Sequence, residues 1–191
     1  MKDHGTRLGR SSPLLGWLLL ILGLLGGPWA FGAGFTVVSA HTQQVGQTYL
    51  LSARIDYRFS PEVLEALESG LGLTVVLEME VRRRRRWLWD DPVARVQLPL
   101  HLEYHTLLDK FQVTNPNLGR RGFDDLSTAL TYMGHIRNFP LVDTALLVTS
   151  QNYYGRLRAR LDTDDLPAPL QLTAYFSRAW QLTSQWYDWP L

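Results

Sequence analysis

The sequence of 191 residues contains no cysteine. This absence excludes disulfide bonds, thiolate zinc sites, a cysteine nucleophile and a lipid attached to an N-terminal cysteine. A strong charge of either sign is also missing, because 19 basic and 18 acidic residues leave a formal net charge of +1. We therefore expect no global electrostatic attraction to nucleic acid and no nucleic-acid partner.

The sequence likewise lacks the motifs of three common catalytic sites. It contains no Gly-x-Ser-x-Gly, no phosphate-binding glycine loop and no His-Glu-x-x-His. We therefore expect a protein that is not an enzyme and that needs no cofactor.

The N-terminal region, in contrast, contains a long apolar run. Residues 14–25 read LLGWLLLILGLL and follow a short segment that carries Lys2, Arg7 and Arg10. A cationic flank followed by an apolar run is the order that export machinery recognises. Because the positive end stays in the cytoplasm, the rest of the chain should lie outside it. The sequence thus predicts a periplasmic domain, or a domain in the periplasm that is anchored to the inner membrane.

Two fates of residues 1–34 stay open. Residues 26–28 (Gly-Gly-Pro) interrupt a helix and small residues follow them, which favours a signal peptide cleaved after Gly34. A clean Ala-x-Ala cleavage site is missing, and residues 14–33 can span a hydrocarbon layer of about 30 Å, which favours a membrane anchor. In either case an N-terminal hydrophobic helix precedes one extracytoplasmic domain, residues 35–191.

This domain shows the two-residue alternation of half-buried β-strands. A strand is predicted at residues 49–59, where apolar and polar residues alternate most clearly. Similar patterns predict strands at 35–42, 73–89, 95–105, 111–114 and 156–162, and short strands near 170–174 and 180–183. Residues 90–92 (Asp-Asp-Pro) have the composition of a turn between two of these strands.

Two helices accompany the strands. Residues 60–62 (Ser-Pro-Glu) combine a capping serine, a proline suited to the first helical position and an acidic first turn, so a helix is predicted at 61–68. Asp124 begins a second helix, whose apolar residues recur at helical spacing until Asn138-Phe139-Pro140 ends it. The predicted fold class is mainly β, a two-layer antiparallel β-sandwich-like domain with two short covering helices.

Four segments carry a family resemblance: residues 57–91, 120–143, 153–172 and 178–191. The first reads YRFSPEVLEALESGLGLTVVLEMEVRRRRRWLWDD and the last reads RAWQLTSQWYDWPL. Together they resemble the proteobacterial family DUF4390, a domain of unknown function. The resemblance implies an exported or membrane-anchored protein, and a gene neighbourhood with a nitrogen-regulation-type sensor kinase and response regulator. It brings no catalytic residue with it.

The most unusual local feature is a run of five arginines followed by tryptophans. It suggests a cationic, aromatic surface that binds anionic lipid head groups or an acidic partner. Alternatively, the arginine stems pack on tryptophan faces beside Glu78 and Glu80 and keep the strand soluble. The candidate binding residues are Arg82, Arg83, Arg84, Arg85, Arg86, Trp87 and Trp89.

Two further clusters have a conceivable chemistry. His101, Glu103 and His105 alternate on one strand face, close enough to converge on a zinc ion, or they form an ordinary solvated face. Residues 162–165 carry three aspartates, a faint calcium pattern without the glycine and glutamate of a helix–loop–helix site. A turn with aspartate as local acceptor explains that segment better.

The C-terminal aromatic residues Trp180, Trp186, Tyr187 and Trp189 offer a last alternative. They either form an exposed ligand platform or pin the end of the chain onto the core.

The sequence favours a non-enzymatic extracytoplasmic binding or accessory domain, with a membrane sensor kinase as a candidate partner. A metal-dependent envelope enzyme and a purely structural envelope component stay open as alternatives.

Overall fold

The computed structural model describes residues 32–85 and 89–191. The predicted signal peptide or anchor, except for its last few residues, lies outside this range, as do Arg86 and Trp87 of the arginine run. Residues Ala33–Leu191 form one compact unit. In the described part of the chain, no helix is long and apolar enough to cross a membrane.

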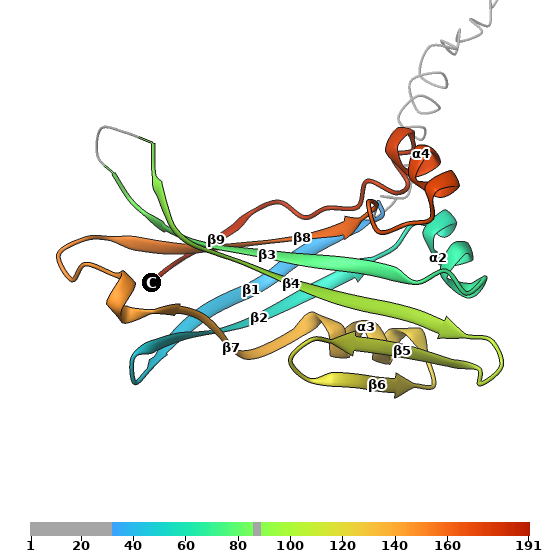
Figure 1. Ribbon diagram of the computed structural model, residues 1–191, viewed down its shortest axis with the longest axis horizontal. Coiled ribbons are helices and arrows are strands. Elements are labelled where there is room, and N and C mark those ends of the chain that lie inside the picture. Colours follow the sequence, from blue (N-terminus) through green and yellow to red (C-terminus); the bar gives the residue numbers. More distant parts are fainter. Residues whose placement is uncertain (1–31, 86–88) are drawn as a thin grey trace, which may run out of the picture. The chain divides into compact units, whose positions relative to one another are not determined.

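A three-stranded sheet begins the unit. It consists of β1 (Gly34–Val45), β2 (Thr48–Arg58) and β7 (His135–Asp143), in the order β1-β2-β7, and both pairings are antiparallel. Figure 1 shows β1 and β2 as a long hairpin with β7 along its second strand. The alternation predicted for residues 49–59 is confirmed from residue 51 onward, where the apolar residues are buried and the arginines between them are exposed, whereas Tyr49 is half-buried.

A six-stranded antiparallel sheet holds the other strands. Its order is β6 (Gly119–Phe123), β5 (Lys110–Asn115), β4 (Asp91–His105), β3 (Leu73–Arg83), β8 (Tyr153–Asp162) and β9 (Tyr187–Pro190). The prediction of a mainly β domain with antiparallel sheets is therefore confirmed.

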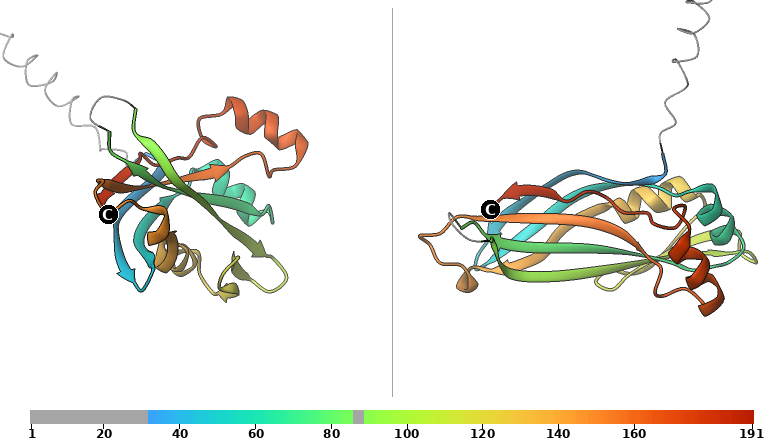
Figure 2. Two further views of the ribbon diagram at one scale, coloured as in Figure 1. Left: turned by 60° about the vertical axis from the view of Figure 1, so that its left-hand side comes forward. Right: turned by 90° about the horizontal axis from the view of Figure 1, so that it is seen from above.

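One hydrophobic cluster is shared by both sheets. It includes Leu51 and Ile55 of β2 together with Leu77, Leu100 and Leu157 of the larger sheet. Strand β1 contacts both β8 and β9, and Figure 2 shows these strands running alongside one another. Burial of these large aliphatic side chains is the main contribution to the stability of the fold, since removing each side chain from water contributes about 1.5–3 kcal/mol of free energy.

The first predicted helix is confirmed with its predicted bounds. Helix α2 (Pro61–Glu68) begins after Ser60, whose side chain accepts a hydrogen bond from the Val63 amide at 3.2 Å. Val63 and Leu67 are buried in the hydrophobic core, so the face of the helix that carries them packs on the rest of the domain.

The second helix is shorter than predicted. Helix α3 (Leu126–Gly134) is capped by Asp125 rather than Asp124, and the chain enters β7 at His135. At Gly134 a Cβ atom would lie 2.1 Å from the Ile55 carbonyl oxygen, so the backbone touches β2 there. Only glycine fits at this close approach, so α3 ends at Gly134 and β7 begins at His135. The helix therefore ends before the predicted stop at Asn138-Phe139-Pro140.

Three predicted strands differ from the structure. The strand expected at 73–89 is confirmed for residues 73–83, where β3 lies, and residues 86–88 of that prediction lie outside the described residues. Asp91 and Pro92 of the expected turn at Asp90-Asp91-Pro92 begin β4 instead, because they pair with Arg83 and Arg82. Residues expected to form a strand at 170–174 belong to a third helix, α4 (Ala168–Phe176), where proline in the first turn favours the helix. The strand expected at 180–183 is only an isolated bridge between Thr183 and Arg160.

Candidate binding site

A pocket of about 730 Å³ lies at the end of the sheets where β1 turns into β2. This volume falls in the range of small-ligand sites, about 300–1,000 Å³. Its lining comes from the β1–β2 hairpin, the end of β3, the loop before β8, and strands β8 and β9. The lining residues are Gln44, Tyr49, Arg84, Thr144, Leu147, Val148, Thr149, Gln151, Asn152, Tyr153, Tyr154, Asp188, Trp189, Pro190 and Leu191.

The side of the pocket formed by β9 depends on a close contact between β8 and β9. Gly155 lies opposite Trp189, and a Cβ atom on Gly155 would sit 2.3 Å from Cζ2 of the indole ring. The indole Nε1 of Trp189 also donates a hydrogen bond to Thr42 Oγ1 of β1 at 3.3 Å. The buried Trp189 therefore ties β9 to the other sheet.

The C-terminal aromatic residues thus pin the chain rather than forming an exposed platform. Trp180 and Trp189 are buried in the core. Trp186 is half-buried, with the guanidinium carbons of Arg156 and Arg158 at 4.2 and 4.6 Å from its ring centroid.

The loop before β8 forms another wall of the pocket and is held by hydrogen bonds at three points. The 3₁₀ turn η1 (Thr144–Leu146) is capped by Asp143, which accepts from the Ala145 amide at 2.8 Å. The Thr144 amide donates to the Gln47 carbonyl at 2.8 Å, and the Val148 amide donates to the Tyr153 hydroxyl at 2.9 Å. The wall is therefore preformed.

Arg84 brings a positive charge to the pocket. Its amide donates to the Asn152 carbonyl at 2.9 Å, and its guanidinium carbon lies 5.3 Å from the centre of the Tyr154 ring. Among the residues that the structure describes, no carboxylate forms an ion pair with Arg84. Arg84 thus has no direct ion pair there, while its charge acts on the nearby carboxylate of Asp90 and contributes to lowering the pKa of that group.

The neighbouring arginines are paired within the chain. Arg82 lies 3.0 Å from Glu80 and donates to the Asp90 carbonyl, while Arg83 and Arg85 share Asp91 Oδ2 at 2.7 and 2.6 Å. Glu80 and Asp91 therefore pair with three of the four arginines that the structure describes in this run. Trp89 is 94% exposed beside them.

Asp90 links this hairpin to β8. Its carboxylate accepts from the Arg85 amide at 3.0 Å and from the Tyr154 hydroxyl at 2.8 Å. These two hydrogen bonds, the backbone one first, hold the pKa of Asp90 below its usual range. Asp90 and Asp91 were assigned to a turn from sequence, so their role as partners of the arginines was missed.

A ladder of ion pairs covers the outer face of β3 and β8. Glu78 accepts hydrogen bonds from the Nε atoms of Arg158 and Arg160, both at 2.9 Å. Partial burial alone would raise the pKa of Glu78, but the hydrogen bonds from both arginines outweigh it and leave the pKa lowered. The opposite charges on these neighbouring strands stabilise their pairing.

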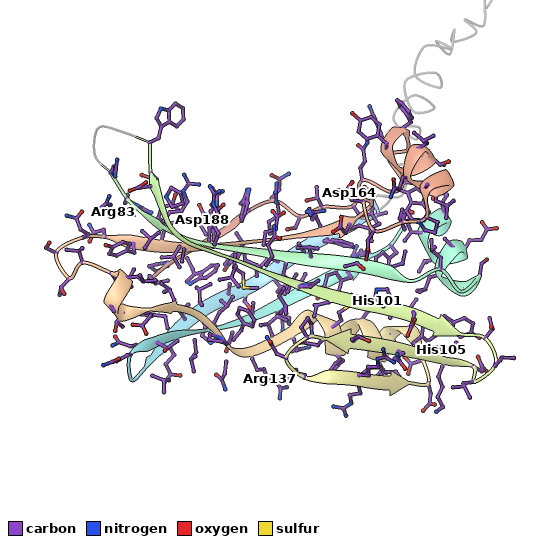
Figure 3. The ribbon with its side chains drawn as sticks, in the orientation of Figure 1. Arg83, His101, His105, Arg137, Asp164 and Asp188 are labelled. Carbon is purple, nitrogen blue, oxygen red and sulfur yellow. The ribbon has the colours of Figure 1, made fainter. Side chains whose placement is uncertain are left out.

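The candidate metal ligands lie away from the pocket, toward the β4–β5 turn, as Figure 3 shows for His101 and His105. Glu103 lies 3.2 Å from His105 and 3.9 Å from His101, and it also accepts from Gln112 at 2.7 Å. No group of three or more metal-ligating side chains capable of holding an ion occurs in residues 32–85 and 89–191. The geometry does not favour the zinc site.

Two of the aspartates of residues 162–165 are engaged in contacts within the chain through their side chains. Asp165 accepts from the Thr74 hydroxyl at 2.7 Å, and Asp162 pairs with Arg160 at 3.0 Å and accepts from the Asp164 amide at 3.3 Å. These contacts fit the turn and not the calcium loop.

One comparison with known proteins found a match. A family model described as "Domain of unknown function (DUF4390)" matches residues 32–190. No curated protein and no solved structure matches the chain.

Proposed function

The chain belongs to the DUF4390 family, because the family model covers the main body of the chain, and from the geometry we propose that it is a binding domain outside the cytoplasm. Its pocket receives a carboxylate-bearing segment of a protein partner. The observation that carries this proposal is the pocket of about 730 Å³ with Arg84 in its wall.

The chemistry of the lining supports a peptide ligand. Gln44, Gln151 and Asn152 provide amide groups that can pair with a peptide backbone, and Tyr153 provides an aromatic surface. Arg84 offers a planar guanidinium that matches a carboxylate in two parallel hydrogen bonds. The ionisable lining residues are otherwise Asp188 and tyrosines, a set suited to binding rather than to proton transfer at neutral pH.

The position of the pocket supports a protein partner over lipid. Gly34, where the chain leaves residues 1–34, pairs with Arg58 at the end of β2, while the pocket lies at the opposite end of that hairpin. In Figure 1 the start of β1 and the β1–β2 turn lie at opposite ends of the long hairpin. The pocket and the arginine hairpin therefore lie remote from the residue at which the chain enters β1.

Two finer expectations belong to the same proposal. The two sheets act as the layers of a β-sandwich, which is supported by the single core cluster to which both contribute. A membrane sensor kinase is the first partner to test, on the strength of the family resemblance alone.

Binding can be tested on arrays of short peptides, each rich in carboxylates and each spotted beside its amide counterpart. We expect carboxylate peptides to bind, and Arg84→Gln to weaken binding about 10-fold or more, since a charge-assisted pair is worth roughly 1.5–3 kcal/mol. Arg95→Gln, which removes an exposed arginine outside the pocket, is the matched control. Equal binding by both variants would reject the pocket as the site.

Location can be tested because the chain has no cysteine. Leu146→Cys introduces one exposed thiol in η1. In cells with a permeabilised outer membrane, a membrane-impermeant maleimide should label this thiol without lysis. Labelling that occurs only after lysis would place the domain in the cytoplasm and reject the proposal.

A further inference from the structure

The four edge strands of the described sheets differ in how well they are protected against pairing with another chain. They are β1 and β7 in the smaller sheet, and β6 and β9 in the larger one. The register of β1 shifts between Val37 and Ser39. Strand β7 contains register shifts and Pro140, and β9 has only four residues with Pro190 among them. Register shifts, prolines and a short length all discourage the addition of a further strand.

Strand β6, in contrast, is regular and open. Its five residues pair with β5 without a register shift, and none of them is a proline. Residues 119–122 are exposed, and a Cβ atom on Gly122 would meet nothing within 4 Å. Figure 1 shows β6 as the outermost strand of its sheet. Because alternate residues of an edge strand direct N–H and C=O groups away from the sheet, β6 offers main-chain hydrogen bonds to an extended chain.

Arg121 of β6 is held in position by aromatic rings. Its guanidinium carbon lies over the rings of Phe123 and of Tyr132 in α3, at 5.7 and 5.1 Å from their centres. The two rings contact each other, with centroids 5.1 Å apart. The face of a guanidinium group stacks on aromatic rings, whereas its N–H groups lie in its own plane and can still bind a carboxylate. The stack therefore prepares Arg121 for an acidic ligand group.

Arg120 places a second positive charge on the opposite face of β6. Consecutive strand residues point to opposite faces, and Arg121 occupies the face that α3 covers. Neither arginine forms an ion pair within residues 32–85 and 89–191. The two aspartates that follow β6 are engaged elsewhere, since one pairs with Lys110 and the other caps α3. The edge thus carries positive charge on both of its faces.

We propose that an extended segment of a protein partner adds to β6 as a further strand, with two adjacent acidic residues that pair with Arg120 and Arg121. In strand addition the main-chain hydrogen bonds supply affinity and the side chains supply specificity. Two adjacent acidic residues fit because they too point to opposite faces. A second copy of this chain does not fit, since pairing β6 with β6 would bring arginines together. No residue of β6 lines the pocket, so this inference does not depend on the proposed ligand of that site.

Hydrogen exchange of the full chain in a non-ionic detergent tests the contact. Exchange is followed by mass spectrometry in a fragment that contains residues 119–123, with a blocked peptide of sequence TVEEVT present at millimolar concentration. A second peptide, with glutamine in place of both glutamates, removes the charge. A third peptide, N-methylated at every residue, keeps the charge but has no N–H group for a β-ladder. These comparisons use the unaltered chain, so they do not depend on the folding of any variant.

We expect the glutamate peptide to slow exchange in this fragment several-fold, and the other two peptides to leave it almost unchanged. The double variant Arg120→Gln, Arg121→Gln should lose the slowing, because both charges of the edge are gone. Arg178→Gln, which removes an exposed arginine from the turn after α4, is the matched control and should keep it.

Several results would overturn the inference. No slowing by the glutamate peptide would reject β6 as the site, and equal slowing by the glutamine or the N-methylated peptide would reject acidic recognition or strand addition, respectively. Slowing that grows with the concentration of the chain alone would assign the edge to a second copy. Slowing by micelles that contain phosphatidylglycerol, but not by the peptide, would assign the arginines to lipid.

Discussion

Removing the hydroxyl group of Tyr57 should stabilise the protein, whereas most substitutions of buried residues destabilise it. The ring is buried in the core cluster in edge contact with Phe35, and its oxygen has no hydrogen-bond partner among residues 32–85 and 89–191. Burial raises the pKa of Tyr57, so the hydroxyl stays protonated. Because an unpaired buried polar group costs about 1–3 kcal/mol, Tyr57→Phe should raise the free energy of unfolding by about 1 kcal/mol. The melting temperature should rise by about 2–4 °C.

Tyr154→Phe is the matched control, because it removes the same atom from a buried tyrosine that does have a partner. The Tyr154 hydroxyl donates to Asp90 at 2.8 Å, so its loss should lower the free energy of unfolding by about 1 kcal/mol. Urea titration followed by tryptophan fluorescence, on a fragment of residues 33–191, measures both changes. A loss of stability in both variants would mean that Tyr57 has a partner, and the reasoning would be refuted.

Three other substitutions test the contacts around the site and the sheets. Gly155→Ala should cost about 1–3 kcal/mol in urea titration by displacing the Trp189 ring, while Gly122→Ala, with open space around it, should change little. Ser60→Ala should cost about 1 kcal/mol by removing the cap of α2, and restored stability in Ser60→Asp would confirm the capping role. The lowered pKa of Glu78 stabilises the fold above its unfolded pKa, and this contribution disappears as the pH falls through the folded value. Acid titration of Glu78→Gln should therefore show a weaker loss of stability below about pH 4.5, and an unchanged titration curve would contradict that role.

Local patterns predicted much of the fold. The hairpin of β1 and β2 was predictable because each strand has one apolar and one polar face, and α2 because its capping residues are adjacent in sequence. Strands β6, β7 and β9 were missed: β6 reads GRRGF, without an apolar face, β7 directly follows α3, and β9 has only four residues. The contact between Gly134 and Ile55 that ends α3 joins distant residues, so no local pattern reveals it.

The site was predictable only in part. The sequence indicated Arg84 as one candidate within the arginine run. It could not show that the neighbouring arginines form ion pairs while Arg84 forms none among the described residues, because those pairs depend on where Glu80 and Asp91 lie in the folded chain. The pocket itself combines residues from 44 to 191, and none of its walls has a sequence signature. Asp90-Asp91 directly after a run of arginines was the one signal that could have indicated internal neutralisation.

The hydrogen bond from Trp189 to Thr42 joins the last strand of the domain to the first, and this has a consequence for the order in which the pocket is assembled. Strand β9 and Gln44 of β1 both line the pocket, and Trp189 joins these two strands. Because the chain is made from its N-terminus, the hairpin of β1 and β2 is synthesised well before residues 187–190. The nascent domain can therefore form this hairpin early, whereas the wall of the pocket that β9 contributes is added only when the final strand docks.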